Sequence, residues 1–272
     1  MYKGYIEVTP TEEEWAELYA HPENNIYNCL ENQYLIISDD NGVVDRFKWV
    51  DGAYKKLSFK QVNNLFVNKI KPRNIQQECA FDMLQDKNTT IKVLTGRFGS
   101  GKTMLMVTNA LQLIYESKFD RIVWVRNNWG VKDTKDIGAL PGDELTKLLP
   151  WVAPLSDHVG GQDGIEMLMQ HEQLEIQHLG HIRGRDIKNA IIMCTEAENL
   201  TKQHVQLLIG RVGEGSNLWL DGDCKQVDAK VFEDNSGLNI AIDRLKGNPL
   251  FGYVHLEKSE RSVTSALADL LD

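Results

Sequence analysis

The sequence predicts an α/β protein whose main unit is a mostly parallel sheet covered by helices on both faces. Beyond about residue 75, apolar stretches of strand composition alternate with stretches of helical periodicity, which is typical of parallel strands connected by helices. A phosphate-binding loop pattern stands at one strand-to-helix junction, where such a loop belongs. Before residue 60 the pattern is that of a small α+β unit. We therefore place one unit at residues 1–62 and a second at residues 63–272.

The first unit is expected to contain one helix and an antiparallel three-stranded meander. Thr9 as N-cap, Pro10 at the first helical position and Glu12 as capping-box acid predict a helix that runs to about Ala20. Turn signals then separate three predicted strands, over residues 33–38, 43–50 and 53–59.

The middle strand of this meander alternates apolar and basic residues. Phe47 and Trp49 alternate with Arg46 and Lys48. The alternation predicts a sheet with one buried face and one face in water.

The second unit is expected to begin with a helix and then to alternate strands with helices. Strands are predicted in the apolar run from residue 91 and over 121–125, 174–179, 190–194, 217–220 and 252–256. Helices are predicted over 75–84, from the loop to 117, over 143–149, 152–158, 163–172 and 236–246, and from 201 and 262. The helix after the loop carries a helical stripe of apolar residues, Met106, Ala110, Leu113 and Ile114.

Composition places the chain among ordinary soluble proteins. Thirty basic against 39 acidic residues give a net charge of −9, which repels nucleic acid unless basic groups cluster locally. The four cysteines form no C-x-x-C pair, which argues against a zinc site and against a disulfide framework. We expect no signal peptide at the acidic N-terminal stretch, no membrane-length apolar run and a cytoplasmic location.

The phosphate-binding loop pattern lies between residues 96 and 103. Gly96, Gly101, Lys102 and Thr103 have the spacing G-x-x-x-x-G-K-T, and Gly99 adds a further flexible position. Such a loop turns its backbone N–H groups inward and forms an anion-binding nest at a helix N-terminus. Lys102 would then reach the outer phosphates, and the Thr103 hydroxyl would bind magnesium. The remaining loop residues expected to contact the nucleotide are Arg97, Phe98, Ser100 and Met104. The alternative is a glycine-rich turn before a helix.

Acidic and amide side chains follow two later apolar strands. Glu196 comes after the run at 191–194 and is the candidate base, or else an acid that caps the next helix. Asp223 and Gln226 follow the strand at 217–220, and Asp223 could instead form an Asx-type turn. Because ligands of open α/β sheets bind beyond the carboxyl ends of the strands, both motifs should converge on the loop. Gln226 would sense the γ-phosphate or position water.

Several motifs in one order resemble those of the PhoH-like P-loop ATPases. The resemblance covers about residue 71 to the end of the chain. It rests on Lys71–Asn74 with Gln77, the loop, Leu140–Asp143, Pro150–Trp151, Arg183–Arg185, Glu196–Asn199, Gly210–Ser216, and Gly222–Asp223 with Gln226 and Asp228.

The resemblance implies a RecA-like core related to the motor half of superfamily one helicases. It implies binding of ATP with Mg²⁺ and ATPase activity, coupled in some members to remodelling of RNA or single-stranded nucleic acid. Because one core is present where helicase motors use two, a homo-oligomer is expected, such as a hexameric ring. Stand-alone members are frequent in bacteriophages, and the short N-terminal unit resembles those members, which would place the protein in a host cytoplasm.

The resemblance also implies roles for further residues. Lys102 and Glu196 would be catalytic, and Arg211 would complete the nucleotide site, in cis or from a neighbouring subunit. Arg261 is a second candidate of this kind, and the alternative for either arginine is a surface ion-pair residue. Gln77 would read adenine through its amide, but the same residue could close a capping box begun by Asn74.

The chain departs from the family pattern in its second acidic motif. That motif normally reads Asp-Glu-Ala-Gln, whereas here Thr195 takes the place of Asp and Glu198 the place of Gln. Metal ligands would then be Thr103 and Glu196, with Asp223 as the stand-in for the missing acid. Arg126 is followed by Asn127 rather than by proline. These departures leave an alternative function, a nucleotide-binding regulator or scaffold with weak or no hydrolysis.

Basic residues with one aromatic are the candidates for contact with RNA or single-stranded DNA. They are Arg126, Trp129, Lys132, Lys135, Arg183 and Arg185. The alternative is a solvated charged loop. His178 and His181 lack a third ligand nearby in sequence, so no metal site is expected there.

Overall fold

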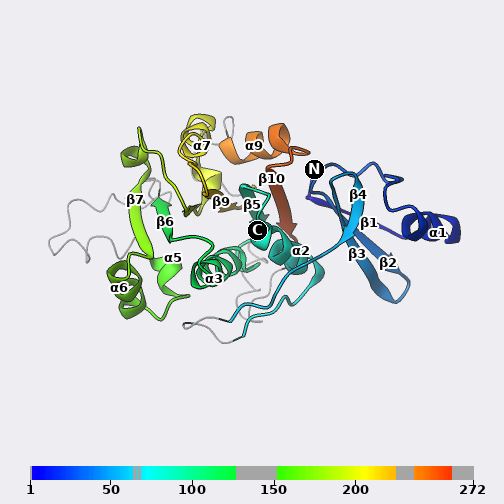
Figure 1. Cartoon of the computed structure of the whole chain (residues 1–272), viewed down its shortest axis with the longest axis horizontal. Helices are drawn as coiled ribbons and strands as arrows, with labels where there is room; N and C mark the ends of the chain where they lie inside the picture. The colour runs from blue at the N-terminus through cyan, green and yellow to red at the C-terminus, as the bar shows by residue number, and fades with distance from the viewer. Residues whose placement is uncertain (1, 64–65, 67–68, 127–151, 225–235, 259–272) are drawn as a thin grey trace, which may run out of the picture.

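The computed structural model describes residues 2–63, 66, 69–126, 152–224 and 236–258, and these contain two separate β-sheets (Figure 1). The N-terminal unit consists of β1 (Tyr5–Val8), α1 (Glu12–Ala20), β2 (Tyr34–Asp39), β3 (Gly42–Val50) and β4 (Ala53–Lys56). In the larger unit, the elements up to β7 are α2 (Ile75–Gln85), β5 (Ile91–Gly96), α3 (Lys102–Tyr115), β6 (Arg121–Arg126), α5 (Ala153–Ser156), α6 (Gln162–Gln170) and β7 (Leu174–His178). The elements after β7 are η2 (Leu179–Ile182), β8 (Ala190–Cys194), η3 (Ala197–Asn199), α7 (Lys202–Ile209), β9 (Asn217–Gly222), α9 (Gly237–Leu245) and β10 (Phe251–Leu256).

The larger sheet has the strand order β10-β5-β9-β8-β6-β7, and every pairing in it is parallel. The α/β, RecA-like core predicted from the sequence is confirmed. All six strands therefore end at one edge of the sheet, and the loop after β5 lies beside the ends of β9 and β10. The predicted helices over 143–149 and from 262 lie outside the described residues.

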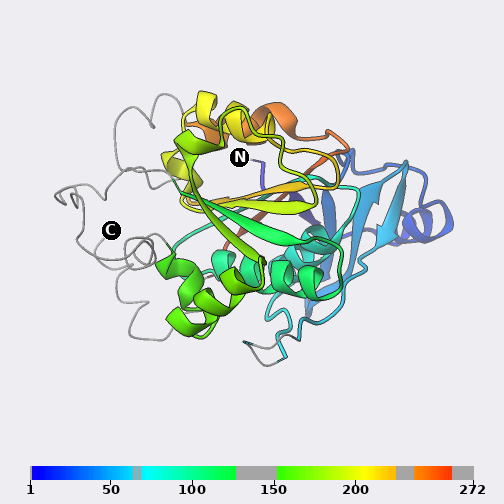
Figure 2. The same ribbon diagram turned by 60° about the vertical axis from the view of Figure 1, so that its left-hand side comes forward.

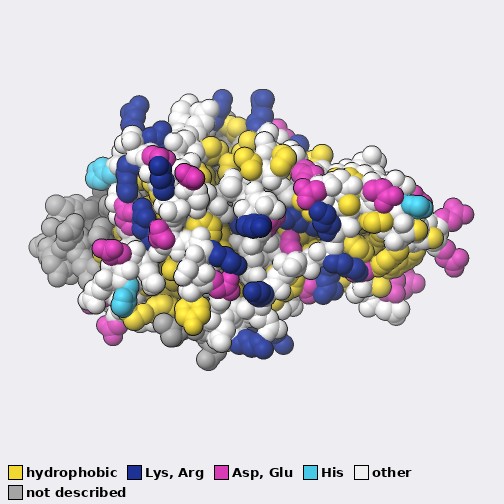
Figure 3. Space-filling view, viewed as in Figure 1, with side chains coloured by type: hydrophobic (Ala, Val, Ile, Leu, Met, Phe, Trp, Pro, Cys, Tyr) yellow, Lys and Arg dark blue, Asp and Glu magenta, His cyan; other side chains and the backbone are white. Residues whose placement is uncertain are grey.

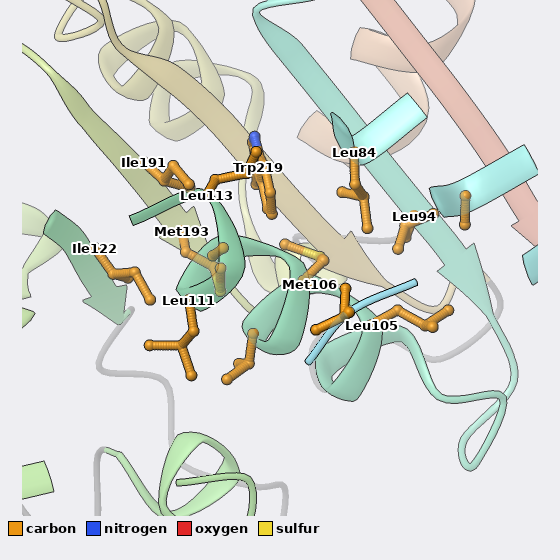
Figure 4. Close-up of a cluster of buried hydrophobic side chains, with 14 of the residues drawn as sticks. Leu84, Leu94, Leu105, Met106, Leu111, Leu113, Ile122, Ile191, Met193 and Trp219 are labelled. Carbon is orange, nitrogen blue, oxygen red and sulfur yellow. The ribbon is translucent and has the colours of Figure 1, made fainter. Parts of the chain in front are cut away.

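Helices cover both faces of this sheet (Figures 1 and 2). Side chains alternate along each strand, so Leu94 of β5 belongs to the apolar cluster that includes residues of α2, α3, α5 and α6, whereas Val93 belongs to the cluster that includes residues of α7 and α9. Figure 4 shows α3 placing Met106 and Leu113 against the strand residues Met193 and Trp219. The buried helical stripe predicted for α3 is confirmed. The packing of α3 in its apolar layer fixes where this helix begins, and therefore where the loop that precedes it ends.

The N-terminal sheet has the order β1-β2-β3-β4, with β2, β3 and β4 forming the predicted antiparallel meander. The sequence reasoning missed β1, which pairs in parallel with β2. The last strand ends at Lys56, earlier than predicted. Helix α1 does end at Ala20, but its N-cap is Thr11 rather than Thr9, because Thr11 and Glu14 form the reciprocal capping box.

The prediction that one face of this sheet lies in water was wrong. Lys48 is only 6% exposed, because its face of the sheet packs against α2. Its ammonium lies 2.5 Å from the Asp86 carboxylate and 3.6 Å from that of Asp82. The Tyr34 hydroxyl donates to Asp82 at 2.8 Å. The N-terminal unit is therefore tied to the helix that begins next to the loop.

In the part of the chain that the structure describes, every helix is too short or too polar to cross a bilayer.

Candidate functional site

The loop between β5 and α3 has the backbone of an anion-binding nest. Gly96, Gly99 and Gly101 all have positive φ, at 156°, 79° and 89°. A Cβ on Gly96 would lie 2.4 Å from the carbonyl oxygen of Leu256, so only glycine fits there. Gly101 is the N-cap of α3, whose free N–H groups point into the loop.

Two side chains of the loop fit a bound phosphate. Lys102 folds over the loop, and its Nζ donates to the carbonyl oxygens of Gly96 at 2.7 Å and Arg97 at 3.2 Å. Ser100 is 1% exposed, and its hydroxyl has no hydrogen-bond partner among the described residues. A cation held over a nest and an unsatisfied buried hydroxyl are what a phosphate would engage.

The first turn of α3 is joined to the end of β9. The Thr103 hydroxyl donates to Oδ2 of Asp221 at 2.6 Å, and Oδ1 of the same carboxylate accepts the Glu196 N–H at 3.2 Å. Asp221 is 2% exposed, and burial raises the pKa of its carboxyl while the Thr103 hydrogen bond and the nearby Lys102 act against that rise. One carboxylate thus connects the loop with the residue predicted to be the base.

Glu196 lies at the rim of this edge. Its backbone adopts the left-handed conformation with φ of 55°, which costs a non-glycine residue on the order of 1 kcal/mol and is frequent at functional sites. Its side chain is half exposed and lies 3.3 Å from Arg126, at the end of β6. A carboxylate in this place is open to water and can be oriented by an arginine.

The two departures from the family pattern lie directly beside Glu196. The Thr195 side chain is 6% exposed, and its hydroxyl has no hydrogen-bond partner among the described residues. Glu198 accepts the Asp223 N–H at 3.1 Å, and burial raises the pKa of its carboxyl to about 8. At neutral pH this acid is therefore mostly protonated, so it offers both a donor and an acceptor, as does the amide that the family pattern carries, although the amide has a second N–H.

Asp221 is the site residue that sequence reasoning missed. The strand was expected to end at Leu220, whereas β9 continues to Gly222 and carries Asp221 to the loop. The signal was an apolar run, Leu218–Leu220, followed by an acid. Asp223, the predicted stand-in for a metal ligand, is buried just beyond the strand, and the partner of Thr103 is Asp221.

Gln77 lies against the loop and also contributes to the start of α2. Its backbone N–H donates to the Asn74 side chain at 3.0 Å, and its Oε1 accepts the Arg73 N–H at 2.9 Å. Its Nε2 lies 3.4 Å from the Ser100 carbonyl oxygen. Capping is thus part of its role, and the reading of adenine stays a prediction.

Arg211 is far from the loop of its own chain in the sheet topology. Its carbonyl accepts the Ile187 N–H and its guanidinium donates to the Arg185 carbonyl at 3.1 Å, near the amino ends of β8 and β9. Arg185 in turn pairs with Glu175 at 2.5 Å. Gln226, Arg261, Trp129, Lys132 and Lys135 lie outside the described residues.

Neither the charge on one face of the molecule nor the potential metal ligands among the described residues mark a second site. On the face shown in Figure 3, Lys and Arg side chains are interspersed with Asp and Glu rather than gathered in one patch. The rings of His178 and His181 lie 5.4 Å apart, but no group of three or more potential ligands occurs among the described residues.

Known proteins resemble the chain over the same region. A family model described as PhoH-like protein matches residues 69–270. Protein PhoH2 of Bacillus subtilis is 32% identical over 295 residues, covering 100% of this chain and 64% of that protein. Protein PhoH2 of Mycolicibacterium smegmatis is 32% identical over 201 residues, covering 73% of this chain and 46% of that protein. Protein PhoH of Escherichia coli K12 is 30% identical over 178 residues, covering 64% and 49%.

The chain spans about half to two thirds of the length of these relatives. A solved structure of an arginase-like protein from T. brucei matches with a TM-score of 0.29 and 13% identity, over 69% of this chain and 66% of that one. That similarity is too low to support a conclusion about fold or function.

Proposed function

The chain belongs to the PhoH-like protein family, a P-loop family, and from this premise we propose that it is a magnesium-dependent ATPase. The observation that carries the proposal is the meeting of four groups at one edge of the sheet: the glycine nest, Lys102, Thr103 with Asp221, and Glu196. Each supplies a part that phosphoryl transfer from ATP to water requires.

Binding would be the work of the loop. Its N–H groups would hold phosphate oxygens, and the Lys102 ammonium, now on two loop carbonyls, would exchange them for the outer phosphates. Magnesium supplies neutralisation of the phosphate charge when it is bound with the nucleotide. The Thr103 hydroxyl donates its hydrogen bond to Asp221, so the lone pairs of its oxygen would be available to bind the cation.

Hydrolysis would depend on Glu196. Its half-exposed carboxylate would accept a hydrogen bond from a water molecule and aim that water at the terminal phosphate, while Arg126 limits the side-chain positions available to it. A positioned base of this kind contributes roughly 10²–10⁴-fold to a rate.

A regulator or scaffold that binds ATP without turning it over is the second candidate. The observation in its favour is Thr195, a neutral residue where the family pattern carries an acid. Steady-state phosphate release separates the two functions, measured for the wild type, Lys102→Ala, Glu196→Gln and the control Lys188→Ala. Lys188 is an exposed lysine near the opposite edge of the sheet. Turnover that is lost in the first two variants and kept in the control supports the ATPase. Nucleotide binding without turnover at any magnesium concentration supports the scaffold.

We also propose that the protein forms a homo-oligomer in which Arg211 serves the nucleotide site of a neighbouring subunit. In support, Arg211 lies near the amino ends of its own strands, and its buried Nε has no partner among the described residues. An arginine of this kind supplied in trans accelerates hydrolysis by roughly 10³-fold or more in other systems. Light scattering after size exclusion, with magnesium and a non-hydrolysable ATP analogue, tests the assembly. A monomer under all conditions would contradict it.

A further inference from the structure

We propose that Asp221 is the positioning residue for magnesium in this chain, and that it replaces the acid missing at position 195. The proposal rests on the proposed nucleotide function. Strands β8 and β9 are neighbours, with Cys194 opposite Leu220. Thr195 and Asp221 are the next residues on the two strands, so both follow the last pair at the same edge of the sheet. At this edge the hydroxyl of Thr195 and the carboxylate of Asp221 are therefore neighbours, and in this chain the carboxylate is on β9.

The contacts of Asp221 are those of a group that orients a metal ligand. Its Oδ2 accepts the Thr103 hydroxyl at 2.6 Å, a short distance for a charge-assisted hydrogen bond. Because the proton of that hydroxyl points at Asp221, the lone pairs of the Thr103 oxygen point away from it. Only in that orientation can the hydroxyl oxygen serve as a ligand for a hard cation.

The Asp221 carboxylate also holds the backbone of Glu196 in place. Its Oδ1 accepts the Glu196 N–H at 3.2 Å, which contributes to the left-handed backbone of Glu196. An ionised Asp has about four acceptor positions, and the hydrogen bonds to described residues use two of them. Acceptor capacity therefore remains for water bound to a cation.

The strand order explains why the exchange preserves the site. In the sequence β5-β9-β8, strand β9 is the direct neighbour of the strand that leads into the loop. Neighbouring strands lie about 4.8 Å apart, so an acid on β9 is one strand nearer to Thr103 than an acid on β8 would be. Thr195, on the farther strand, has a buried hydroxyl without a partner among the described residues. That side chain has the place of the acid in the family pattern but forms no bond to the loop.

The Thr103–Asp221 hydrogen bond would also be present if Asp221 only held α3 against β9. The magnesium dependence of nucleotide binding distinguishes that structural role from the positioning of a metal ligand. The experiment titrates the full chain with a fluorescent ATP analogue, once in EDTA and once in magnesium. Variants are Asp221→Asn, which keeps the shape and removes the charge, and Asp221→Cys, which replaces the carboxylate by a small thiol that accepts hydrogen bonds only weakly. Asp186→Asn, an exposed acid near the opposite edge, is the matched control. Thermal unfolding of each variant reports folding separately.

We expect the wild type and the control to bind at least tenfold more tightly with magnesium than in EDTA. Asp221→Asn should bind as the wild type does in EDTA and lose the magnesium enhancement. Asp221→Cys should likewise lose the magnesium enhancement, because a thiol is too weak an acceptor to orient the Thr103 hydroxyl. If Asp221→Asn is unfolded, the cysteine variant carries the test with its neutral, easily buried side chain.

The acid and the hydroxyl residue can be moved back to the other strand by a double substitution. In Thr195→Asp with Asp221→Thr, the carboxylate returns to β8, and the magnesium enhancement should recover to within about threefold of the wild type. A full enhancement in Asp221→Asn, or none in the folded double variant, overturns the assignment of Asp221. No binding by the wild type in either condition overturns the proposed function instead.

Discussion

The hydroxyl of Thr103 donates to the carboxylate of Asp221 at 2.6 Å and joins the first turn of α3 to the end of β9. This bond places a buried negative charge beside a positively charged loop. It also fixes the direction of the hydroxyl oxygen that magnesium would need. Both consequences can be tested on Thr103 itself.

Thr103→Ser should behave as the wild type, because serine keeps the hydroxyl. Thr103→Ala should weaken magnesium-dependent nucleotide binding about tenfold and leave binding in EDTA unchanged. It should also lower the free energy of unfolding by about 1–3 kcal/mol, since the buried Asp221 carboxylate loses a hydrogen-bond donor. Nucleotide titration and urea denaturation check the two effects. Equal loss of binding in EDTA would mean that the hydroxyl acts on the loop and not on the metal.

Glu198→Gln should be nearly silent at pH 7. Burial raises the pKa of Glu198 to about 8, so the residue is mostly neutral there, and glutamine keeps an acceptor for the Asp223 N–H. We expect nucleotide affinity within about threefold of the wild type, while Glu198→Ala should lose roughly 1–3 kcal/mol of unfolding free energy from the unsatisfied N–H and the lost packing. Urea denaturation of both variants checks this. A glutamine variant as unstable as the alanine variant would show that Glu198 acts as an anion.

Lys48→Ala should destabilise the protein strongly. The ammonium of Lys48 is buried with Asp86 at 2.5 Å, and removing one partner of a buried pair costs roughly 3–5 kcal/mol. Lys55→Ala is the matched control in the neighbouring strand, because the pair of Lys55 with Asp51 is exposed and should contribute less than about 1 kcal/mol. Thermal unfolding of the two variants gives the comparison. A similar small effect for both would mean that the N-terminal sheet is not held on α2 by this pair.

Lys92→Met should change the pH dependence of stability. Lys92 is 2% exposed, and burial lowers the pKa of its ammonium to about 7, although two carbonyl oxygens accept its hydrogen bonds. The unfolded chain holds this proton up to about pH 10.4, so the unfolded state binds more protons between pH 7 and 10. The contribution of Lys92 to the free energy of unfolding therefore rises with pH, by up to about 1.4 kcal/mol for each unit.

The methionine variant lacks that dependence. Its stability relative to the wild type should be greatest at pH 6.5 and should decline as the pH rises to 9.5. Urea denaturation at pH 6.5, 8 and 9.5 measures the difference. The same difference at all three values would show that Lys92 keeps its proton throughout.

The sequence was sufficient to predict the core and the loop, because their signals are local. The spacing of Gly96, Gly101, Lys102 and Thr103 requires a strand before it and a helix after it, and the structure has both. The helical stripe with Met106 and Leu113 is buried as predicted. These features depend on residues at most seven positions apart in the sequence, which spacing and periodicity can detect.

Asp221 and Lys48 could not be placed in this way, because their partners are distant in the sequence. Asp221 reaches Thr103 only because β9 lies between β5 and β8 in the sheet. The order of the strands cannot be inferred from an acid at the end of one of them. Lys48 has the alternation of a solvated face, yet α2 brings Asp82 and Asp86 over it. In both cases, tertiary contacts decide the role of a charged residue.

The start of α1 was misplaced for a different reason. Thr9 with Glu12 and Thr11 with Glu14 both satisfy the capping-box spacing, so the local pattern allows two starts. The structure selects Thr11. Strand β1 was missed because a run of four residues is too short for alternation to establish a strand, even though Tyr5, Ile6 and Val8 favour one, and because its partner β2 is distant in the sequence.

Whether the Gly96–Thr103 loop binds nucleotide can be measured by calorimetric titration of ATP with magnesium into the wild type and Lys102→Ala. We expect saturable binding by the wild type at one site per chain, and affinity at least tenfold weaker in Lys102→Ala with an unchanged thermal unfolding midpoint of the free protein. Lys188→Ala should bind as the wild type does. No saturable binding by the wild type, or equal affinity in wild type and Lys102→Ala, would contradict the assignment of the Gly96–Thr103 loop as the nucleotide site.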